Sequence, residues 1–427
     1  MDKKLQAFVE FMDRSHSKYH ATENLVKQLQ AEGYTCLQES KAWNLVPGGK
    51  YYMTRGCSSV MAFRIPKKEA KGFLMSASHT DHPTFKIKEN GELTGAYTRF
   101  ATEKYGSVLM GTWLDRPLSV AGRVIVETEN GIKTRLIDID KDLFLIPHVA
   151  IHMNRAANDG IAWNPTVDTL PLFGNADAAG KFDELLQQAA GGKILAHDLW
   201  LYVRQNATVW GMQDEYISAA ALDDLQCAWG CTQGFLEAEE GGHVPVLCVF
   251  DSEEIGSFTN QGADSGYLSG LLDKICNCMH WDLQQMLCQS FMVSADNAHA
   301  LHPNHPEYSD PTNAPIVGAG IAIKFNAAQR YTTDGLSAAI FRKICQKAGV
   351  PVQNYYNRAD LAGGTTLGNV SLSHVTVPSV DIGLAQLAMH SCYETAGTAD
   401  TLYLVDAMRQ YYATNLQTHE DGTYEIA

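Results

Sequence analysis

Two adjacent glutamates, Glu253 and Glu254, stand at the end of a short apolar run. The run predicts a buried strand over residues 244–250, which places both carboxylates where the strand leaves the sheet. Ligands bind open α/β sheets at that carboxyl edge. Two neighbouring glutamates repel each other unless a positive charge lies beside them, and a metal ion supplies one. One glutamate could then be a ligand and the other free for proton transfer. For an isolated pair, a solvated turn is the simpler interpretation.

Other predicted strands also end in side chains that could bind a metal. The strand around residues 73–75 leads to His79 and Asp81, and alternate residues of an extended segment face the same side. One of the pair can ligate a metal while the other orients the ligand or the neighbouring base. A second strand ends at Asp296, and a later apolar segment ends at His390. The pattern therefore predicts one site at the edge of a sheet.

Asp223 and Asp224 stand at the start of a predicted helix, where capping alone would explain one of them. The two histidines and the carboxylates form a nitrogen–oxygen donor set that suits zinc, with cobalt or manganese as alternatives. The carboxylates outnumber the ligands of one catalytic zinc. They suit two divalent metal ions that share a bridging carboxylate and a bridging hydroxide. The unliganded glutamate would take the proton as general base.

The composition is that of an ordinary globular protein and argues against several functions. The chain has 427 residues, 45% hydrophobic and 19% charged, so two or three domains are expected. No apolar run reaches membrane-spanning length and the charged N-terminus is no signal peptide, so we expect no membrane partner. The formal net charge of −15 argues against nucleic-acid binding. Ten scattered cysteines without a CxxC pair indicate reduced thiols and a cytoplasmic location.

The elements that must hold these residues fall into two predicted domains. Residues 1–89 and 196–427 mix short apolar strands with helices, including helices over 23–31 and 333–348, and form the catalytic domain. In residues 90–195, by contrast, short segments with the alternating pattern of strands are separated by turn residues. This pattern predicts an inserted β-rich domain.

Two histidines within the predicted insert, His148 and His152, are four residues apart. On a helix this spacing would place both on one face, where they could bind a metal. The flanking residues favour an irregular segment, however, so packing or a subunit interface explains the pair at least as well. A helix is predicted further on, over residues 181–190.

Seven motifs occur in the order SASHTDHP, LDD, DSEEIGS, SADNAHALHPNHPE, IKFNAAQRYTT, GGTTLG and QLAMHS. Their sequence and order resemble those of the M18 aminopeptidases, the aspartyl aminopeptidase family, over almost the whole chain. The resemblance implies an α/β fold of the zinc-peptidase kind, with a mixed, mostly parallel sheet sandwiched by helices. It also implies that the inserted β-rich domain forms dimers, and that the homo-oligomer is a dodecamer built from them.

The resemblance further implies how two metal ions would be held. His79, Asp223 and Asp296 would bind the first ion, and Asp223 would bridge to the second. Glu254 and His390 would complete the second site.

By the same resemblance, Glu253 would be the general base and Asp81 the acid that orients it. His152 would reach into the active site of a neighbouring subunit and help to hold the peptide substrate. Lys324 would pair with an acidic side chain of that substrate, which would offset the repulsion expected from an acidic protein.

Four positions differ from residues that are usual in this family, and none is an implied ligand. Asp224 would add negative charge beside the metals, and the other three would line or support the pocket: His82, Asn297 and Tyr393.

The leading hypothesis is a metal-dependent aminopeptidase that removes the N-terminal residue of peptides and prefers Asp or Glu. A second hypothesis keeps the dinuclear site but assigns carboxypeptidase or amide deacylase chemistry, since related metallohydrolases use similar ligands. A third is a non-catalytic, self-assembling paralogue. Against it, every expected ligand and the base are present in the sequence.

Overall fold

Short apolar runs form the centre of a nine-stranded sheet, and strands in its middle are buried along their whole length. The computed structural model describes residues 2–361, 363–364, 366–419 and 421–427, so Thr365 of the GGTTLG motif lies outside the described residues. In the order in which they pair, the strands are β1 (Thr35–Cys36), β2 (Lys50–Arg55), β3 (Ser59–Arg64), β13 (Val244–Phe250), β4 (Phe73–His79), β14 (Phe291–Ala295), β18 (Ser379–Gly383), β16 (Ile321–Phe325) and β17 (Val352–Tyr356).

The sheet is mixed, with a parallel centre. Strands β13, β4, β14 and β18 are parallel to their neighbours within this group, whereas β3 and β16 pair with it in antiparallel fashion. Parallel strands end at a common edge, so the residues that follow β13, β4 and β14 meet there.

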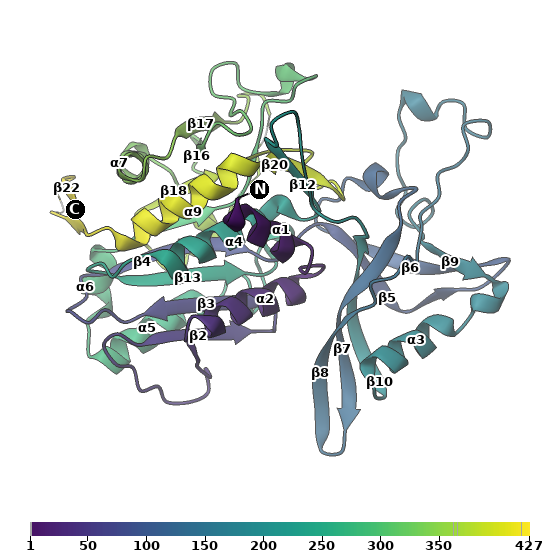
Figure 1. The fold of residues 1–427 in the computed structure, drawn as a ribbon, viewed down its shortest axis with the longest axis horizontal. Helices are drawn as coiled ribbons and strands as arrows, with labels where there is room; N and C mark the ends of the chain where they lie inside the picture. Colours follow the sequence, from purple (N-terminus) through teal and green to yellow (C-terminus); the bar gives the residue numbers. More distant parts are fainter. Residues whose placement is uncertain (1, 362, 365, 420) are drawn as a thin grey trace.

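Helices cover both faces of this sheet, because alternate side chains of each strand point to opposite sides (Figure 1). Leu247 and Val249 of β13 pack in the core cluster of one face, whereas Val246 and Cys248 pack in that of the other. The helices of the first face are α1 (Lys3–Met12), α2 (Lys18–Ala31), α4 (Leu222–Glu237), α7 (Gly335–Ala348) and α9 (Thr398–Ala413). Those of the second face are α5 (Tyr267–Met279), α6 (Leu283–Cys288) and α8 (Leu367–Ser371). The predicted fold class is confirmed.

Two smaller sheets complete this part of the molecule. A five-stranded sheet flanks the segment that carries His390, and its strands in pairing order are β11 (Thr208–Trp210), β12 (Tyr216–Ala219), β20 (Glu394–Gly397), β19 (Ala385–Leu387) and β15 (Ala298–His299). The chain ends in the hairpin of β21 (Leu416–Thr418) and β22 (Tyr424–Ile426).

A six-stranded antiparallel sheet lies to one side of the helix-covered sheet (Figure 1). Its strands in pairing order are β8 (Gly131–Asp138), β7 (Leu118–Thr128), β10 (Ile194–Val203), β5 (Thr84–Leu93), β6 (Tyr97–Tyr105) and β9 (Leu172–Asn175). Helix α3 (Lys181–Ala190) packs on it through Phe182 and Leu186. The division into domains stays a prediction, since β5 and β10 run across the two predicted boundaries.

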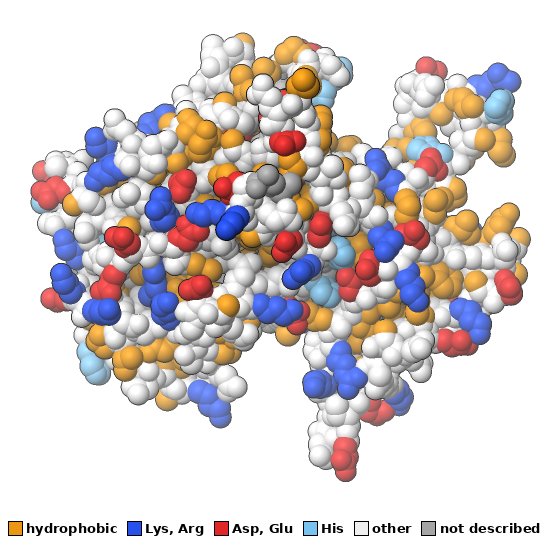
Figure 2. All heavy atoms as spheres, in the orientation of Figure 1, with side chains coloured by type: hydrophobic (Ala, Val, Ile, Leu, Met, Phe, Trp, Pro, Cys, Tyr) orange, Lys and Arg blue, Asp and Glu red, His pale blue; other side chains and the backbone are white. Residues whose placement is uncertain are grey.

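A long connection over residues 147–171 lies between β8 and β9 of this sheet. Apart from the short turn η2 (Ala157–Asp159) it contains no helix or strand among its described residues. Four of its apolar side chains are 45% to 81% exposed: Val149, Ile151, Met153 and Val167. Figure 2 shows hydrophobic side chains gathered on this projecting part, whereas acidic and basic groups are interspersed over the rest of the visible face.

Local sequence signals place some elements well and others poorly. The helices expected over 181–190 and 333–348 correspond to α3 and α7, and Asp334 caps α7 in a capping box with Ser337. The helix expected from residue 23 begins earlier, at Lys18, because the Ser17 side chain accepts from the His20 N–H at the true N-terminus. No helix of the described residues is long and apolar enough to cross a bilayer.

Candidate metal centre

Three neighbouring parallel strands deliver the first part of the site. In β4 and β13 the partners in register include His79 and Phe250, and β14 ends beside them just before Asp296. Glu253 and Glu254 follow β13 in the one-turn helix η4 (Glu253–Ile255). The adjacent carboxylates and the histidine are therefore brought to one edge by the sheet itself.

The described residues contain three groups of side chains that could hold a metal ion, and the groups share some members. Within each group, the ligating atoms lie within 4.8 Å of one another. The groups are His79 with Asp223, Asp224 and Asp296; His79 with Glu253 and Glu254; and Asp223 with Glu254 and His390. Asp223 is shared by the first and third groups, and its two carboxylate oxygens lie 3.5 Å from the Nε2 atoms of His79 and His390 respectively. The five predicted metal ligands are thus gathered at one place.

Asp223 lies at the start of α4, but it is no helix cap. The helix has no side-chain cap, and the backbone angles of Asp223 and Asp224 are non-helical. The Asp223 side chain faces the two histidines. Asp224 Oδ2 accepts from the His79 backbone N–H at 3.2 Å. The capping interpretation of this pair is therefore wrong, and both carboxylates belong to the site.

Asp81 ties the end of β4 to the turn that carries the two glutamates. Its Oδ1 accepts from the Glu253 N–H and its Oδ2 from the Glu254 N–H, both at 3.1 Å. The Tyr105 hydroxyl donates to Oδ2 at 2.7 Å. Asp81 lies outside the three groups of ligating atoms and orients the segment that holds the predicted base.

Glu394 contacts the site, and sequence reasoning missed it. Its Oε2 accepts from the Asp223 N–H at 3.0 Å and its Oε1 from the His390 N–H at 2.6 Å, so one carboxylate fixes the backbone of two predicted ligands. Burial, followed by the nearby charge of Asp223, raises the pKa of Glu394 to about 8. Its only signal in the sequence is a position four residues after His390, which by itself specifies no contact.

The site is buried and rich in charge. Burial raises the pKa of Asp296, and it raises the pKa of Glu254 to about 7 even though His390 opposes the shift. For His390, burial alone would lower the pKa, but contacts with Asp223 and Glu254 raise it to about 11. The positive charge of the histidines therefore offsets only part of the negative charge of these carboxylates, and a further cation would offset the rest.

The residues present fit divalent metal ions. Three carboxylate oxygens at this point are buried and have no hydrogen-bond partner among the described residues: Asp223 Oδ1, Asp224 Oδ1 and Glu254 Oε1. A buried carboxylate oxygen without a hydrogen bond is costly unless a cation pairs with it, and Asp223 Oδ1 and Glu254 Oε1 each face a histidine nitrogen, at 3.5 and 3.4 Å. Imidazole nitrogen and carboxylate oxygen together are donors that zinc accepts.

Of the two residues predicted to bind substrate, Lys324 is buried and His152 is exposed. Lys324 of β16 is 2% exposed, and its Nζ lies 3.6 Å from Asp296 Oδ1, at the margin of the cluster. Burial alone would lower its pKa, but the charge of Asp296 raises it, so the ammonium stays charged. His152 is exposed in a turn of the 147–171 connection and belongs to none of the groups of ligating atoms in the described chain.

Three of the positions that the resemblance marks as unusual, Asn297, Tyr393 and His82, belong to none of the three groups of ligating atoms among the described residues. Asn297 donates to the Leu222 carbonyl, Gln226 and Gln386 and so braces the turn before Asp223. The Tyr393 hydroxyl donates to the Asn206 carbonyl at 2.8 Å. His82 and Asp81 line a small cavity that is too narrow for a substrate, with a volume of about 10 Å³.

A larger cleft of about 650 Å³ lies beside the segment that carries His390, and its lining includes His299, His302, Tyr355, Arg358 and Leu109. The Leu109 N–H donates to the His390 carbonyl at 3.0 Å, so the cleft and the ligand segment are in direct contact. A cleft of this size holds a small peptide segment. A buried histidine–carboxylate cluster at the carboxyl edge of an α/β sheet, with such a cleft beside the segment that carries His390, is typical of a metallohydrolase.

Comparison with known proteins gives the family. The family described as "Aminopeptidase I zinc metalloprotease (M18)" matches residues 11–412. A protein of Clostridium novyi named "Probable M18 family aminopeptidase 2" is 41% identical over 420 residues, which are 95% of this chain and 97% of that one. The chain therefore belongs to the M18 aminopeptidase family, and it is a zinc aminopeptidase and an exopeptidase.

Solved structures agree with this assignment. The chain is similar to one in a "Cryo-EM structure of the Ape4 and Nbr1 complex", with 33% identity and a TM-score of 0.92 over 96% of this chain and 85% of that one. It is also similar to a chain in a "Structure of S. cerevesiae mApe1 dodecamer", with 25% identity and a TM-score of 0.85 over 96% of each chain.

Proposed function

We propose that the protein removes single N-terminal residues from peptides with a centre of two divalent cations that share Asp223. One observation carries this proposal: Asp223 belongs to two groups of close ligating atoms, one with His79 and Asp296 and the other with Glu254 and His390. A bridging carboxylate is typical of hydrolases that use two metals.

His79, Asp223 and Asp296 would hold one cation, and Asp223, Glu254 and His390 the other. Zinc fits this donor set, and cobalt or manganese could replace it. When bound, such cations supply Lewis acidity and activate a water molecule for attack on the peptide carbonyl.

Glu253 is the general base in this proposal. Its backbone N–H is fixed by Asp81 Oδ1 at 3.1 Å, and its carboxylate shares a group of close ligating atoms with His79 and Glu254. It is not needed as a ligand of either cation, so it is free to accept a proton from water and to donate it to the leaving amine.

We further propose a preference for N-terminal Asp or Glu. Lys324 is a buried cation at the margin of the cluster, paired with Asp296 at 3.6 Å. An acidic side chain of the substrate that reaches its ammonium would gain a charge-assisted hydrogen bond in a water-poor site. A leucine or alanine side chain would gain none.

The active enzyme is a homo-oligomer in this proposal, with the region over residues 90–195 forming the dimer. A structure similar to this chain is described as a dodecamer. The connection over 147–171 exposes apolar side chains around His152, and exposed apolar patches mark interaction sites. We expect a second copy to cover them and His152 to enter its active site. All ten cysteines, each in the described part of the chain, are free, which fits a reducing cytoplasm.

The test uses the metal-free protein, to which zinc, cobalt or manganese is restored in turn. Peptides that differ only in their first residue are compared with their acetylated counterparts. We expect loss of activity on metal removal, recovery on metal addition, faster cleavage after Asp or Glu than after Leu, and no cleavage of acetylated peptides. Efficient cleavage of acetylated peptides would exclude an aminopeptidase, and inactivity with all three metals would favour a non-catalytic paralogue.

A further inference from the structure

The segment Tyr105 to Leu109 leaves the end of β6 and passes directly along the metal centre. β6 belongs to the six-stranded sheet, whereas the predicted ligands all come from the helix-covered part of the chain. This segment contacts Asp81, Glu254 and His390. It is therefore a structural connection between the two regions.

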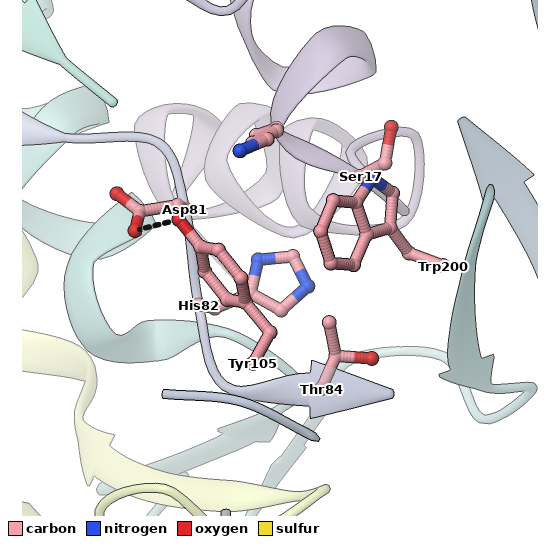
Figure 3. Close-up of a pocket in the computed structure, with 7 residues that line it drawn as sticks. Ser17, Asp81, His82, Thr84, Tyr105 and Trp200 are labelled. Atoms are coloured by element: carbon pink, nitrogen blue, oxygen red, sulfur yellow. Dashed lines mark hydrogen bonds between the residues drawn. The ribbon is translucent and has the colours of Figure 1, made fainter. Parts of the chain in front are cut away.

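Tyr105 contacts Asp81 at the point where that carboxylate organises the site. Figure 3 shows the phenol directed at the carboxylate, and the hydroxyl donates to Asp81 Oδ2 at 2.7 Å. The same oxygen accepts the Glu254 N–H at 3.1 Å. Asp81 is 1% exposed, so a lost donor there would not be replaced freely by water.

The Tyr105 ring is held in place by its surroundings. The Lys18 ammonium lies 4.9 Å from the ring centroid and pairs with Asp251 at 2.9 Å. Burial, followed by the charges of Asp81 and Asp251, raises the pKa of Tyr105 above its usual range. The phenol consequently keeps its proton and acts only as a donor to Asp81.

The next residues contact two of the three ligands of the second proposed cation, Glu254 and His390. Gly106 has a φ of +69°, and a Cβ atom on it would lie 3.1 Å from Glu254 Cβ. The Ser107 carbonyl lies 3.1 Å from His390 Nδ1. A carbonyl can only accept, so Nδ1 donates to it, and His390 directs Nε2 towards Asp223 and Glu254.

We propose that Tyr105 and the Ser107 carbonyl are positioning groups through which the six-stranded sheet fixes the metal centre. Tyr105 holds Asp81 and with it the turn of Glu253 and Glu254, while Ser107 sets the orientation and proton position of His390. The proposal rests on the metal sites described under the proposed function. Partners of this kind, one contact removed from the metal, typically change metal affinity or activity by about 10- to 100-fold.

The experiment compares Tyr105→Phe with Tyr97→Phe, a matched control at the exposed other end of β6, where the side chain is 57% exposed. Metal-free samples are titrated with Zn²⁺ against a chromophoric chelator, the visible spectrum of the Co²⁺ form is recorded, and kcat and KM are measured on a peptide. For Tyr105→Phe we expect about tenfold weaker metal binding, an altered Co²⁺ spectrum and a fall in kcat at nearly constant KM. The control should match the wild type.

A folded Tyr105→Phe variant with wild-type metal affinity and an unchanged Co²⁺ spectrum would overturn the proposal. Gly106→Ala gives a second test, because its methyl group would lie 3.1 Å from Glu254 Cβ on a backbone with a φ of +69°, and it should also weaken metal binding. Metal binding as tight as that of the wild type in this variant would likewise contradict a positioning role for residues 105–107. The metal titrations need no turnover, so a wild type that cleaves no peptide would refute the proposed function while the affinities still decide this inference.

Discussion

The carboxyl edge of the nine-stranded sheet and the connection over residues 147–171 hold their functional side chains in different ways. At the edge, His79 and Asp81 are each 1% exposed and are fixed by several hydrogen bonds. In the connection, His152 is exposed among apolar neighbours. The first region is complete within one chain, whereas the second presents surface that one chain does not bury. If the proposed function holds, we expect metal binding to need only one chain and full activity to need an assembly.

The largest effect is expected from a substitution that removes the proposed base and leaves the metal ligands in place. Glu253→Gln should lower kcat by about 10²- to 10⁴-fold, because a neutral amide cannot accept a proton. Its metal content should equal that of the wild type, since the five proposed ligands are intact. Metal analysis beside steady-state kinetics checks both statements, with Glu239→Gln, an exposed glutamate, as control. Loss of metal from Glu253→Gln would show that Glu253 is a ligand instead.

His152 tests whether the exposed connection acts on a neighbouring chain. His152→Ala should lower kcat/KM by about 10-fold or more, from a lost hydrogen bond to the transition state, with metal affinity unchanged. Mixing this variant with Glu253→Gln should restore activity, because a Glu253→Gln chain supplies His152 to a partner that has its own base. Random dimers would recover about a quarter of wild-type activity. A mixture as inactive as its components would place His152 in its own chain's site or outside catalysis.

Lys324 tests specificity at the buried edge. Lys324→Gln should reduce the ratio of kcat/KM for N-terminal Asp over N-terminal Leu by about tenfold, because the charge-assisted contact is lost. The ratio cancels any shared effect of a disturbed Asp296. Lys343→Gln, on the exposed face of α7, is the control. An Asp:Leu ratio equal to that of the wild type would exclude Lys324 as the specificity residue.

The smallest effect concerns stability of the helix-covered part rather than turnover. His243 is 1% exposed, with Nε2 3.1 Å from the Gln289 carbonyl, and burial lowers its pKa from 6.5 to about 4. The unfolded chain therefore binds a proton that the folded chain does not, so the free energy of unfolding should fall as the pH drops from 6.5 to 4. The loss attributable to His243 is at most about 3 kcal/mol.

Urea unfolding at several pH values checks this, with His243→Gln expected to show a shallower pH dependence. His419→Gln, in the C-terminal hairpin, should keep the wild-type dependence. Equal slopes for all three proteins would mean that His243 does not contribute.

Sequence patterns predicted elements best where the local signal was complete. Strand β13 matches the expected range 244–250, and α3 matches 181–190, because uniform apolar content and helical spacing are properties of neighbouring residues. The start of α2 was misplaced, since either Ser17 or Thr22 could cap it and only the packed chain shows which one does. The capping role considered for Asp223 was wrong for a similar reason: a carboxylate at a helix start is equally suited to a metal.

The sequence by itself determined which residues of this protein could bind metals, that all of them but Asp223 follow predicted strand ends, and which family their motifs resemble. Only the tertiary structure showed that Glu394 accepts from both Asp223 and His390, and that Tyr105 and Ser107 reach the site from another sheet. The physical reason is distance along the chain. A run of neighbouring residues specifies a strand or a helix, but a hydrogen bond between residues 171 positions apart, as from Asp223 to Glu394, exists only once the sheets and helices have packed.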